Sequence, residues 1–380
     1  MKTIARYNGT ILMTLVLLLL ASCRPEEPVD NIDSGVPVYP VVYSSASSFS
    51  DTRAVPATGW TEYSASVEYQ RVPTSIQSFF DHPTRARSGV FSYDVDNHSW
   101  ISSVRIDPDN QMKYTVFGYM PSTLNGTLTK DAGTGVYTMA FTNLNPVSKE
   151  DFMVIVGVGR TANAGTDDDV TLNNHSYEGK DGTQGNENNL VLMVDHMYAG
   201  VDFQFKLNEQ YSQLRTIKIT KITLSTPSTN YLNGSVTFTP TTTGNVTTYT
   251  MSEPVYTEVT PQSPTDIPEE VNIVLNPPLT LTTDYQPVYG YLVPVDQNKL
   301  VNGRYELSMT TEYEVYDKGT PEVFLSARSA TNAVTLSPPD GQTSLNRGTK
   351  YVLQSIVAPT YLYQLSDNDL NNPTISITQP

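Results

Sequence analysis

The sequence predicts an all-β protein built from two antiparallel β-sandwich domains in tandem. β-Branched and aromatic residues are abundant, and the chain contains 24 Tyr and 26 Pro, a composition that favours short pleated strands joined by tight turns. Several segments alternate apolar and polar residues with period two, and no segment carries a long amphipathic helical period. With 380 residues the chain exceeds one ordinary core, so two domains are expected behind an N-terminal leader.

The first 23 residues have the three parts of a signal peptide: a positive start, an apolar core and a short stretch, residues 20–23, in which cleavage is expected. Lys2 and Arg6 give a positive start, and Ile11 to Leu20 form an apolar core. As a helix this core rises roughly 15 Å, about half of the hydrocarbon thickness of a bilayer. We therefore expect residues 1–22 to be a cleaved signal peptide rather than a membrane span, and the residues that follow the apolar core indicate the lipoprotein type.

The stretch LASC at residues 20–23 resembles a bacterial lipobox. This resemblance implies lipidation of Cys23, with acyl chains such as palmitate, and anchorage in the outer membrane, since several chains together hold a protein stably. The alternative is an ordinary signal peptide with an incidental cysteine. The following RPEE at residues 24–27 resembles the export signal of surface-exposed lipoproteins in Bacteroidetes-type envelopes; the alternative is a soluble tether.

The net charge limits the classes of partner that the protein can bind, and the single cysteine limits the interactions that can stabilise the fold. The formal net charge is −16, with a pI near 4.6, and such a surface repels nucleic acid. We therefore expect no nucleic-acid partner, and the simplest role of the charge is solubility. Cys23 is the only cysteine, so no intrachain disulfide can form and stability must come from core burial and sheet hydrogen bonds.

The mature chain divides by composition into a tether and two domains. Residues 23–54 are expected to be a lipidated tether or pro-segment. Within them, VPVYPVVY at residues 36–43 is apolar enough for a strand, and its two prolines confine it to a sheet edge or to extended docking. We place an N-terminal β-sandwich domain at residues 55–188 and a C-terminal one at residues 189–380.

In the first domain, Gln111 to Met120 alternates two sets of residues, and Phe152 to Val158 is a continuous apolar run. The continuous run predicts a strand covered on both faces. Residues 159–189 are polar and rich in turn formers, which indicates a long surface loop leading into the second domain. Phe79-Phe80 could form a short helical turn.

In the second domain, Val201, Phe203, Phe205 and Leu207 line one face of a strand. The stretch from Thr216 to Leu224 changes the parity of its apolar residues, which predicts a one-residue β-bulge near Thr220-Lys221. Asn208 to Thr216 could include a short helical turn, and residues 240–270 are expected to be irregular. A long half-buried strand is predicted for Glu306 to Tyr316, with these residues facing inward: Leu307, Met309, Thr311, Tyr313 and Val315.

No motif for catalysis or metal binding emerges from the sequence. The four histidines are His82, His98, His175 and His196; they are far apart, and no HExxH, GxSxG or phosphate-loop motif occurs. We therefore expect no catalytic residue, no metal site and no cofactor. Asp167 to Asp169 and Asp181 to Asn186 invite a calcium interpretation for the acidic stretch 167–189, but they match no EF-hand, and a solvated acidic loop is the simpler interpretation.

An ordered set of motifs resembles the fimbrillin family, the subunits of lipoprotein-derived fimbriae in Bacteroidetes-type bacteria. The resemblance spans roughly residues 52–357. Its motifs, in chain order, are Thr52-Arg53-Ala54 before Trp60, the region around Trp100, Val116 to Pro121, Asp151 to Ile155, Val194 to Phe203, Leu214 to Ile222 and Leu345 to Tyr351.

The resemblance implies two transthyretin-like β-sandwich domains and export as a lipoprotein to the cell surface and fimbrium. It also implies that an arginine-specific protease removes the N-terminal segment and that a strand of another subunit fills the opened groove. Carried over, Arg53 is the expected processing site; the alternatives are Arg71, Arg85 and Arg87. VPVYPVVY would be the removed strand, and Pro373 to Pro380 a candidate donor.

The sequence leaves three candidate functions. The first is a non-enzymatic structural or adhesive fimbrial subunit, with other fimbrial subunits and a host glycan or protein receptor as partners; minor, tip or stalk-associated subunits and an uncleaved surface lipoprotein remain open. The second is a glycan-binding surface lipoprotein, because Trp60, Trp100 and the tyrosines could stack on sugars, although such residues more often fill cores. The third, a hydrolase, would need a pocket with two close carboxylates.

Overall fold

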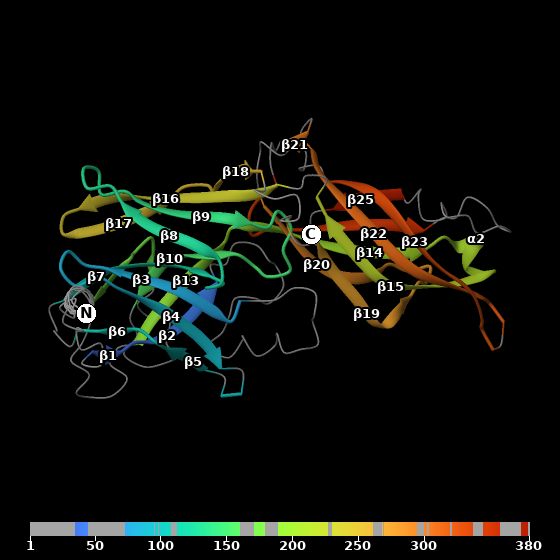
Figure 1. The fold of residues 1–380 in the computed structure, drawn as a ribbon, viewed down its shortest axis with the longest axis horizontal. Helices are drawn as coiled ribbons and strands as arrows, with labels where there is room; N and C mark the ends of the chain where they lie inside the picture. The colour runs from blue at the N-terminus through green and yellow to red at the C-terminus, as the bar shows by residue number, and fades with distance from the viewer. Residues whose placement is uncertain are drawn as a thin grey trace, which may run out of the picture.

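The computed structural model describes residues 35–44, 73–94, 96–97, 99–107, 112–159, 171–178, 189–226, 230–260, 268, 270–294, 300–301, 304–319, 321–336, 345–357 and 374–378. Within these residues the protein is built of β-strands, and the one helix is the four-residue α2 (Glu209–Ser212). Figure 1 shows two lobes along the long axis of the molecule. The predicted all-β class is therefore confirmed.

The main sheet of the first lobe contains seven strands in a continuous path, with two short strands beside it. Its order is β2 (Tyr39–Ser44), β13 (Asn189–His196), β10 (Met153–Gly159), β7 (Lys113–Met120), β3 (Ser75–Asp81), β4 (Arg87–Asp94) and β5 (Ser99–Ser102). β11 (Thr171–Leu172) pairs with β10, and β12 (Ser176–Glu178) pairs with β7. A separate two-stranded ladder joins β1 (Val36–Pro37) to β6 (Arg105–Ile106).

A second sheet packs on one face of this main sheet. Its order is β17 (Val246–Met251), β16 (Tyr231–Thr243), β9 (Tyr137–Leu144) and β8 (Asn125–Lys130), with β18 (Val255–Val259) also pairing with β16. One core lies between the two sheets and includes Phe117 and Val154, while another core on the opposite face includes Val116 and Ile155. β10 is therefore buried along its whole length, which confirms the predicted strand covered on both faces.

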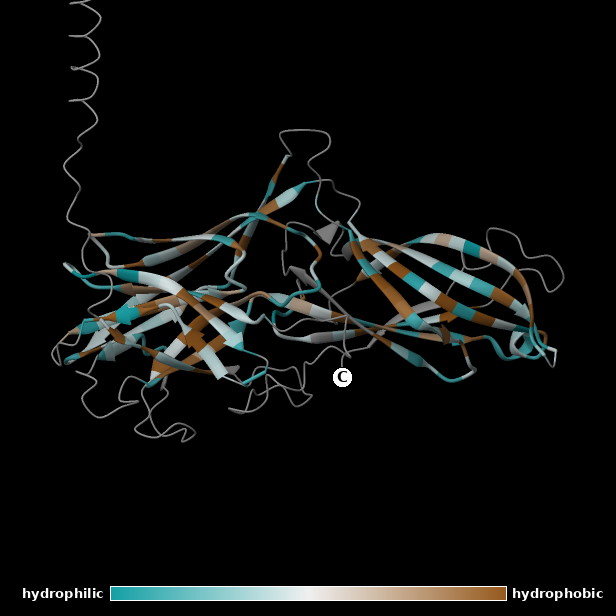
Figure 2. Ribbon diagram, turned by 60° about the horizontal axis from the view of Figure 1, so that its bottom comes forward, coloured by the Kyte–Doolittle hydropathy of each residue, from teal (hydrophilic) through white to brown (hydrophobic). Residues whose placement is uncertain are grey.

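The second lobe has two sheets around one core. The first has the order β20 (Gln286–Pro294), β14 (Tyr198–Leu207), β24 (Lys350–Val357) and β25 (Thr374–Thr378). The other has the order β19 (Val271–Thr280), β15 (Arg215–Ser225), β22 (Arg304–Asp317) and β21 (Leu300–Val301), with β23 (Val323–Leu336) pairing with β22. Figure 2 shows alternating hydrophobic and hydrophilic bands along the strands of this lobe.

Local patterns predicted several details of the second lobe. The register of β15 against both neighbours shifts between Ile219 and Lys221, which confirms the β-bulge. In β22 the five residues expected to face inward are all buried. α2 forms inside the stretch expected to contain a helical turn; Asn208 caps it, because its side-chain oxygen accepts a hydrogen bond from the amide of Gln210.

Other expectations differ from the structure. Residues 231–259 form β16, β17 and β18, so the expected irregular stretch from residue 240 is wrong over most of its described length; β9 and β8 supply the sheet onto which these Thr-rich strands add. Residues 171–178 contain β11 and β12 rather than surface loop. Phe79 and Phe80 lie within β3, not in a helical turn.

The sheets do not divide at the expected domain boundary between residues 188 and 189. β13 begins at Asn189 and is an inner strand of the first lobe, and β16 to β18 return to that lobe after β14 and β15 have entered the second. The chain therefore crosses between the lobes more than once. No helix among the described residues is long and apolar enough to span a bilayer.

Candidate assembly site and surface pocket

The amino-terminal segment, residues 35–44, joins two edges of the first lobe. β2 pairs in parallel with β13, with Tyr39 opposite Asn189 and Ser44 opposite Val194. β1 pairs with β6, and between these ladders the amide of Val38 donates to the carbonyl of Val104 at 3.3 Å. β2 is the end strand of its sheet (Figure 1), which confirms the edge position predicted from the two prolines.

The same segment also supplies side chains to the core. Val38 and Val42 are 0% and 2% exposed and belong to the core that contains Ile106, Leu190 and Leu192. Without the segment, one side of β13 would lose its backbone partners and this core would lose two valines. We call the position that residues 35–44 occupy the amino-terminal slot; a vacant slot would present both unpaired backbone groups and apolar surface to another strand.

Most residues predicted to be processed or to bind calcium lie outside the described part of the chain. These are Cys23, Arg53, Arg71, Asp167 to Asp169 and Asp181 to Asn186. Arg85 and Arg87 are described; their guanidinium groups lie 3.2 and 3.6 Å from the carboxylate of Asp107. Residues 374–378 of the candidate donor tail form β25, which pairs antiparallel with β24 of the same chain.

The described histidines form no metal centre, and no group of three or more candidate metal ligands occurs among the described residues. His98 lies outside them. His196 Nδ1 lies 2.6 Å from Asp151 Oδ2. His175 is fully buried, stacks on Phe117 with ring centroids 4.4 Å apart, and its Nδ1 lies 2.7 Å from the carbonyl oxygen of Val116.

Burial among aromatic rings determines the protonation state of the His175 side chain. Burial lowers the pKa of His175 to about 4, although the hydrogen bond with the Val116 carbonyl opposes the shift. The ring is therefore neutral at physiological pH and acts as a core residue of the first lobe.

Two of the sequence motifs meet at the junction between the lobes. Arg347, in the loop before β24, forms an ion pair with Asp195 of β13 and a second one with Glu253 at 3.2 Å. Backbone hydrogen bonds reinforce the contact, since the amide of Gly348 donates to the carbonyl of Tyr198 at 2.9 Å. The sequence analysis identified both motifs but predicted no contact between them, because they are distant in the chain.

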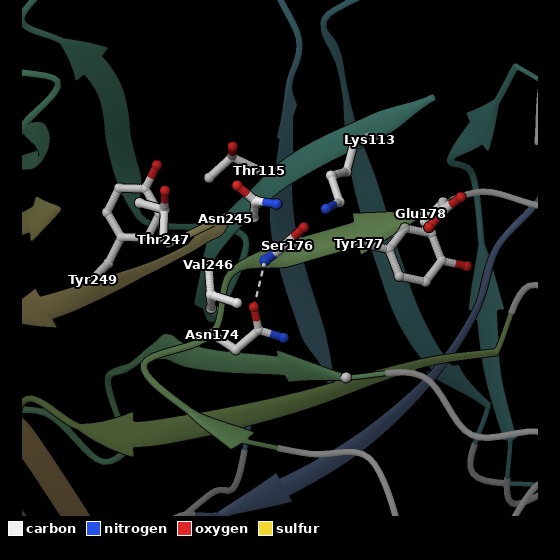
Figure 3. A pocket seen from close by; sticks show the side chains of 11 residues that line it. Lys113, Thr115, Asn174, Ser176, Tyr177, Glu178, Asn245, Val246, Thr247 and Tyr249 are labelled. Carbon is white, nitrogen blue, oxygen red and sulfur yellow. Dashed lines mark hydrogen bonds between the residues drawn. The ribbon is translucent and has the colours of Figure 1, made fainter. Parts of the chain in front are cut away.

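A pocket of about 560 Å³ opens at the surface of the first lobe, where β7 and β12 face the β16–β17 turn (Figure 3). Its size falls in the range of small-molecule sites, about 300–1,000 Å³. The lining residues are Lys113, Thr115, Gly159, Asn174, Ser176, Tyr177, Glu178, Asn245, Val246, Thr247 and Tyr249. Polar side chains therefore dominate its wall, and sequence reasoning did not identify it.

Two cross-strand pairs form one wall of the pocket. Lys113 lies opposite Glu178, and Thr115 lies opposite Ser176, in the ladder between β7 and β12. The other wall is held in place by backbone contacts: the amide of Tyr249 donates to the carbonyl of Asn173 at 2.8 Å. The pocket is thus bounded on both sides by hydrogen-bonded strands.

Comparisons with known proteins found similar solved structures at low sequence identity. No family model and no curated protein matches it. Two candidate cell adhesion proteins, from Bacteroides uniformis and Bacteroides fragilis, are each 11% identical over 91% of this chain, and the matches cover 98% and 97% of those chains, both with a TM-score of 0.35.

The fimbrial anchor protein Mfa2 of Porphyromonas gingivalis is also 11% identical, over 90% of this chain and 97% of that one, with a TM-score of 0.28.

Proposed function

We propose that the protein is a structural or adhesive subunit of a cell-surface fimbrium, exported as a lipoprotein through Cys23 to the outer membrane. Its tandem lobes would correspond to two transthyretin-like domains. The observation that carries the proposal is the amino-terminal slot, because residues 35–44 pair with two strands and bury Val38 and Val42 in the core. The role is structural rather than enzymatic.

Strand replacement at this slot supplies the assembly mechanism. Arg53 follows β2 in the chain, so cleavage there would cut the covalent link between the strand and the body of the first lobe. Departure of residues 35–44 would expose the edge of β13, and a strand from a second subunit would restore its hydrogen bonds and its apolar contacts. Residues 374–378 are the candidate donor; they would have to leave β24, with which they pair.

An arginine-specific protease applied to the full chain tests this proposal, with Arg53→Lys as a matched variant that keeps the charge but resists the enzyme. We expect the wild-type chain to be cut after Arg53 and to form oligomers in mass photometry, while Arg53→Lys stays monomeric. N-terminal sequencing identifies the cut, and Arg71→Lys and Arg85→Lys control for the alternative sites. A chain cut at Arg53 that releases residues 23–53 and stays monomeric would refute strand replacement.

A second candidate function, glycan binding at the cell surface, is favoured by the polar pocket rather than by an aromatic platform. Trp100 is half-buried and packs on Tyr93 with ring centroids 5.4 Å apart, so it supports the core as the simpler interpretation expected. Hydroxyl, amide and charged groups instead gather at the pocket. A panel of oligosaccharides presented to the full chain tests this candidate.

A further inference from the structure

We propose that the pocket between β7, β12 and the β16–β17 turn is a binding site for a short neutral oligosaccharide. The inference rests on the glycan-binding candidate and adds to it a place in the fold, a ligand class and the contacting residues. It is independent of strand replacement, because the amino-terminal slot and the pocket use different side chains.

The pocket is lined by one positively charged and one negatively charged side chain. Lys113 and Glu178 lie directly opposite each other across β7 and β12, and within the described part of the chain neither has an ion pair or a side-chain hydrogen bond. Both are exposed, so their charged groups can reach a ligand. One cation and one anion give no net attraction for a charged ligand, but both form strong hydrogen bonds with sugar hydroxyls.

The hydroxyl groups of the wall are also available. Thr115 and Ser176 form the next polar pair along the same ladder and are half-buried. Among the described residues, their hydroxyls have no hydrogen-bond partner, although each hydroxyl can both donate and accept. A ligand rich in hydroxyl groups satisfies such a surface, whereas an apolar ligand would leave these groups without partners at a cost in free energy.

The pocket is organised before a ligand arrives. Asn174 is fixed at its base, since its side-chain amide donates to the carbonyl of Val158 at 2.9 Å and its oxygen accepts from the amide of Ser176 at 3.1 Å (Figure 3). A bridge between Asn174 and Thr248 ties this base to β17. Ligand binding therefore orders little of the backbone, which lowers the entropic cost of association.

The opposite wall offers apolar surface of the kind that the C–H faces of sugars contact. Val246 is 61% exposed, and Tyr249, three residues further along β17, also lines the pocket. The ring of Tyr249 packs edge-on against His175, with centroids 5.5 Å apart, so the tyrosine is held in a fixed orientation. The β16–β17 side thus adds the apolar surface of Val246 and Tyr249 to the polar groups of the pocket, a combination that suits the polar edges and the C–H faces of a pyranose.

Ligand-observed NMR titration of the full chain tests the inference with maltotriose, cellotriose, mannotriose and laminaritriose as neutral probes, and trigalacturonate as a charged probe. The double variant Thr115→Val/Ser176→Ala removes the two wall hydroxyls. Its matched control is Thr127→Val/Thr129→Val, on the exposed strand β8. We expect at least one neutral trisaccharide to bind and the pocket variant to weaken it about tenfold, since two neutral hydrogen bonds are lost, while the control stays within about twofold.

The outcomes separate the inference from the function on which it rests. If no neutral probe binds the wild-type chain, both the glycan-binding candidate and the pocket assignment fail. If a probe binds the wild type and the pocket variant equally, glycan binding stands and the pocket assignment fails. Tighter binding of trigalacturonate than of every neutral probe would overturn the ligand class. Circular dichroism of both double variants confirms that each is folded, so a loss of binding reports on the pocket.

Discussion

In the first lobe, residues 35–44 pair with both β13 and β6 and place Val38 and Val42 in the core, whereas the larger sheet of the second lobe ends at β23. In the described part of the chain β23 pairs only with β22, and its first three residues, Val323, Phe324 and Leu325, are 55%, 53% and 44% exposed. The first edge is closed by a segment that the core needs. Within the described residues, the second edge carries no further strand and its first apolar side chains are exposed.

This difference separates two ways in which an edge strand can serve assembly. A strand that fills a core can be exchanged, because its removal creates a specific vacancy that only a similar strand restores. An open apolar edge can be extended, because its backbone groups already await a partner. The predictions below test this contrast, beginning with the largest expected effect.

The largest effect is expected from a charge inside the amino-terminal slot. Val38→Asp places a carboxylate at a fully buried position, which should lower the free energy of unfolding of the first lobe by about 4 kcal/mol or more. Urea unfolding measures the loss, and hydrogen exchange should show β13 losing protection. Val41→Asp is the matched control, since Val41 lies three residues further along the same segment, within β2, and is only half-buried; equal losses from both variants would show that the slot is not a core position.

The second prediction concerns the pH dependence of stability, which should differ between the two lobes. All four histidines precede β14, and burial lowers the pKa of His175 in the first lobe to about 4. As pH falls below about 6.5, the unfolded chain takes up this proton while the folded chain does not until about pH 4. The stability contributed by neutral His175 is thus present above pH 6.5 and is lost between pH 6.5 and 4, by about 3 kcal/mol in total.

Hydrogen exchange at several pH values should therefore show the first lobe opening before the second. His175→Phe keeps a ring in the aromatic cluster and should remove this part of the pH dependence, although the lost hydrogen bond to Val116 costs about 1 kcal/mol at every pH. An unchanged pH dependence in this variant would contradict the assignment to His175.

The third effect concerns the joint between the lobes. Arg347→Met removes the ion pair between Arg347 and Asp195, and because the side chain of Asp195 is only 11% exposed, we expect a loss of about 2–3 kcal/mol in the free energy of unfolding. Arg215→Met is the matched control: it breaks an ion pair with Asp317, which is 55% exposed, and should cost less than about 1 kcal/mol. Thermal unfolding measures the loss of stability in both variants. A wider distribution of interatomic distances in small-angle scattering for Arg347→Met alone would show that the lobes have lost their fixed orientation.

The sequence predicted those features of the fold that depend only on residues close together in one strand. The phase slip around Thr220 located the bulge, the alternation from Leu307 to Val315 gave the buried face of β22, and the prolines of VPVYPVVY placed β2 at an edge. Each of these follows from the two-residue period of a strand and from the missing amide of proline.

The sequence did not predict what depends on contacts between distant segments. The strands at residues 231–259 form because β9 offers an edge, although their Thr and Pro content indicated irregular structure. Strand register brings Lys113 opposite Glu178 at the pocket. The passage of the chain between the lobes brings Arg347 to Asp195. A single sequence carries no local signal for either contact.

The smallest effect on stability should come from the open edge of the second lobe. Phe324→Thr removes an exposed ring whose contact is with Tyr316, at 5.6 Å between centroids, so the free energy of unfolding should change by less than about 0.5 kcal/mol. Self-association should respond far more, because an exposed apolar edge strand invites pairing with another chain. Light scattering at rising protein concentration should show weaker association for Phe324→Thr than for the wild type, with Thr331→Ser further along β23 as control. If instead Phe324→Thr destabilised the second lobe as strongly as Val38→Asp does the first, both edges would be parts of a core, and the contrast between an exchangeable and an extendable edge would not hold.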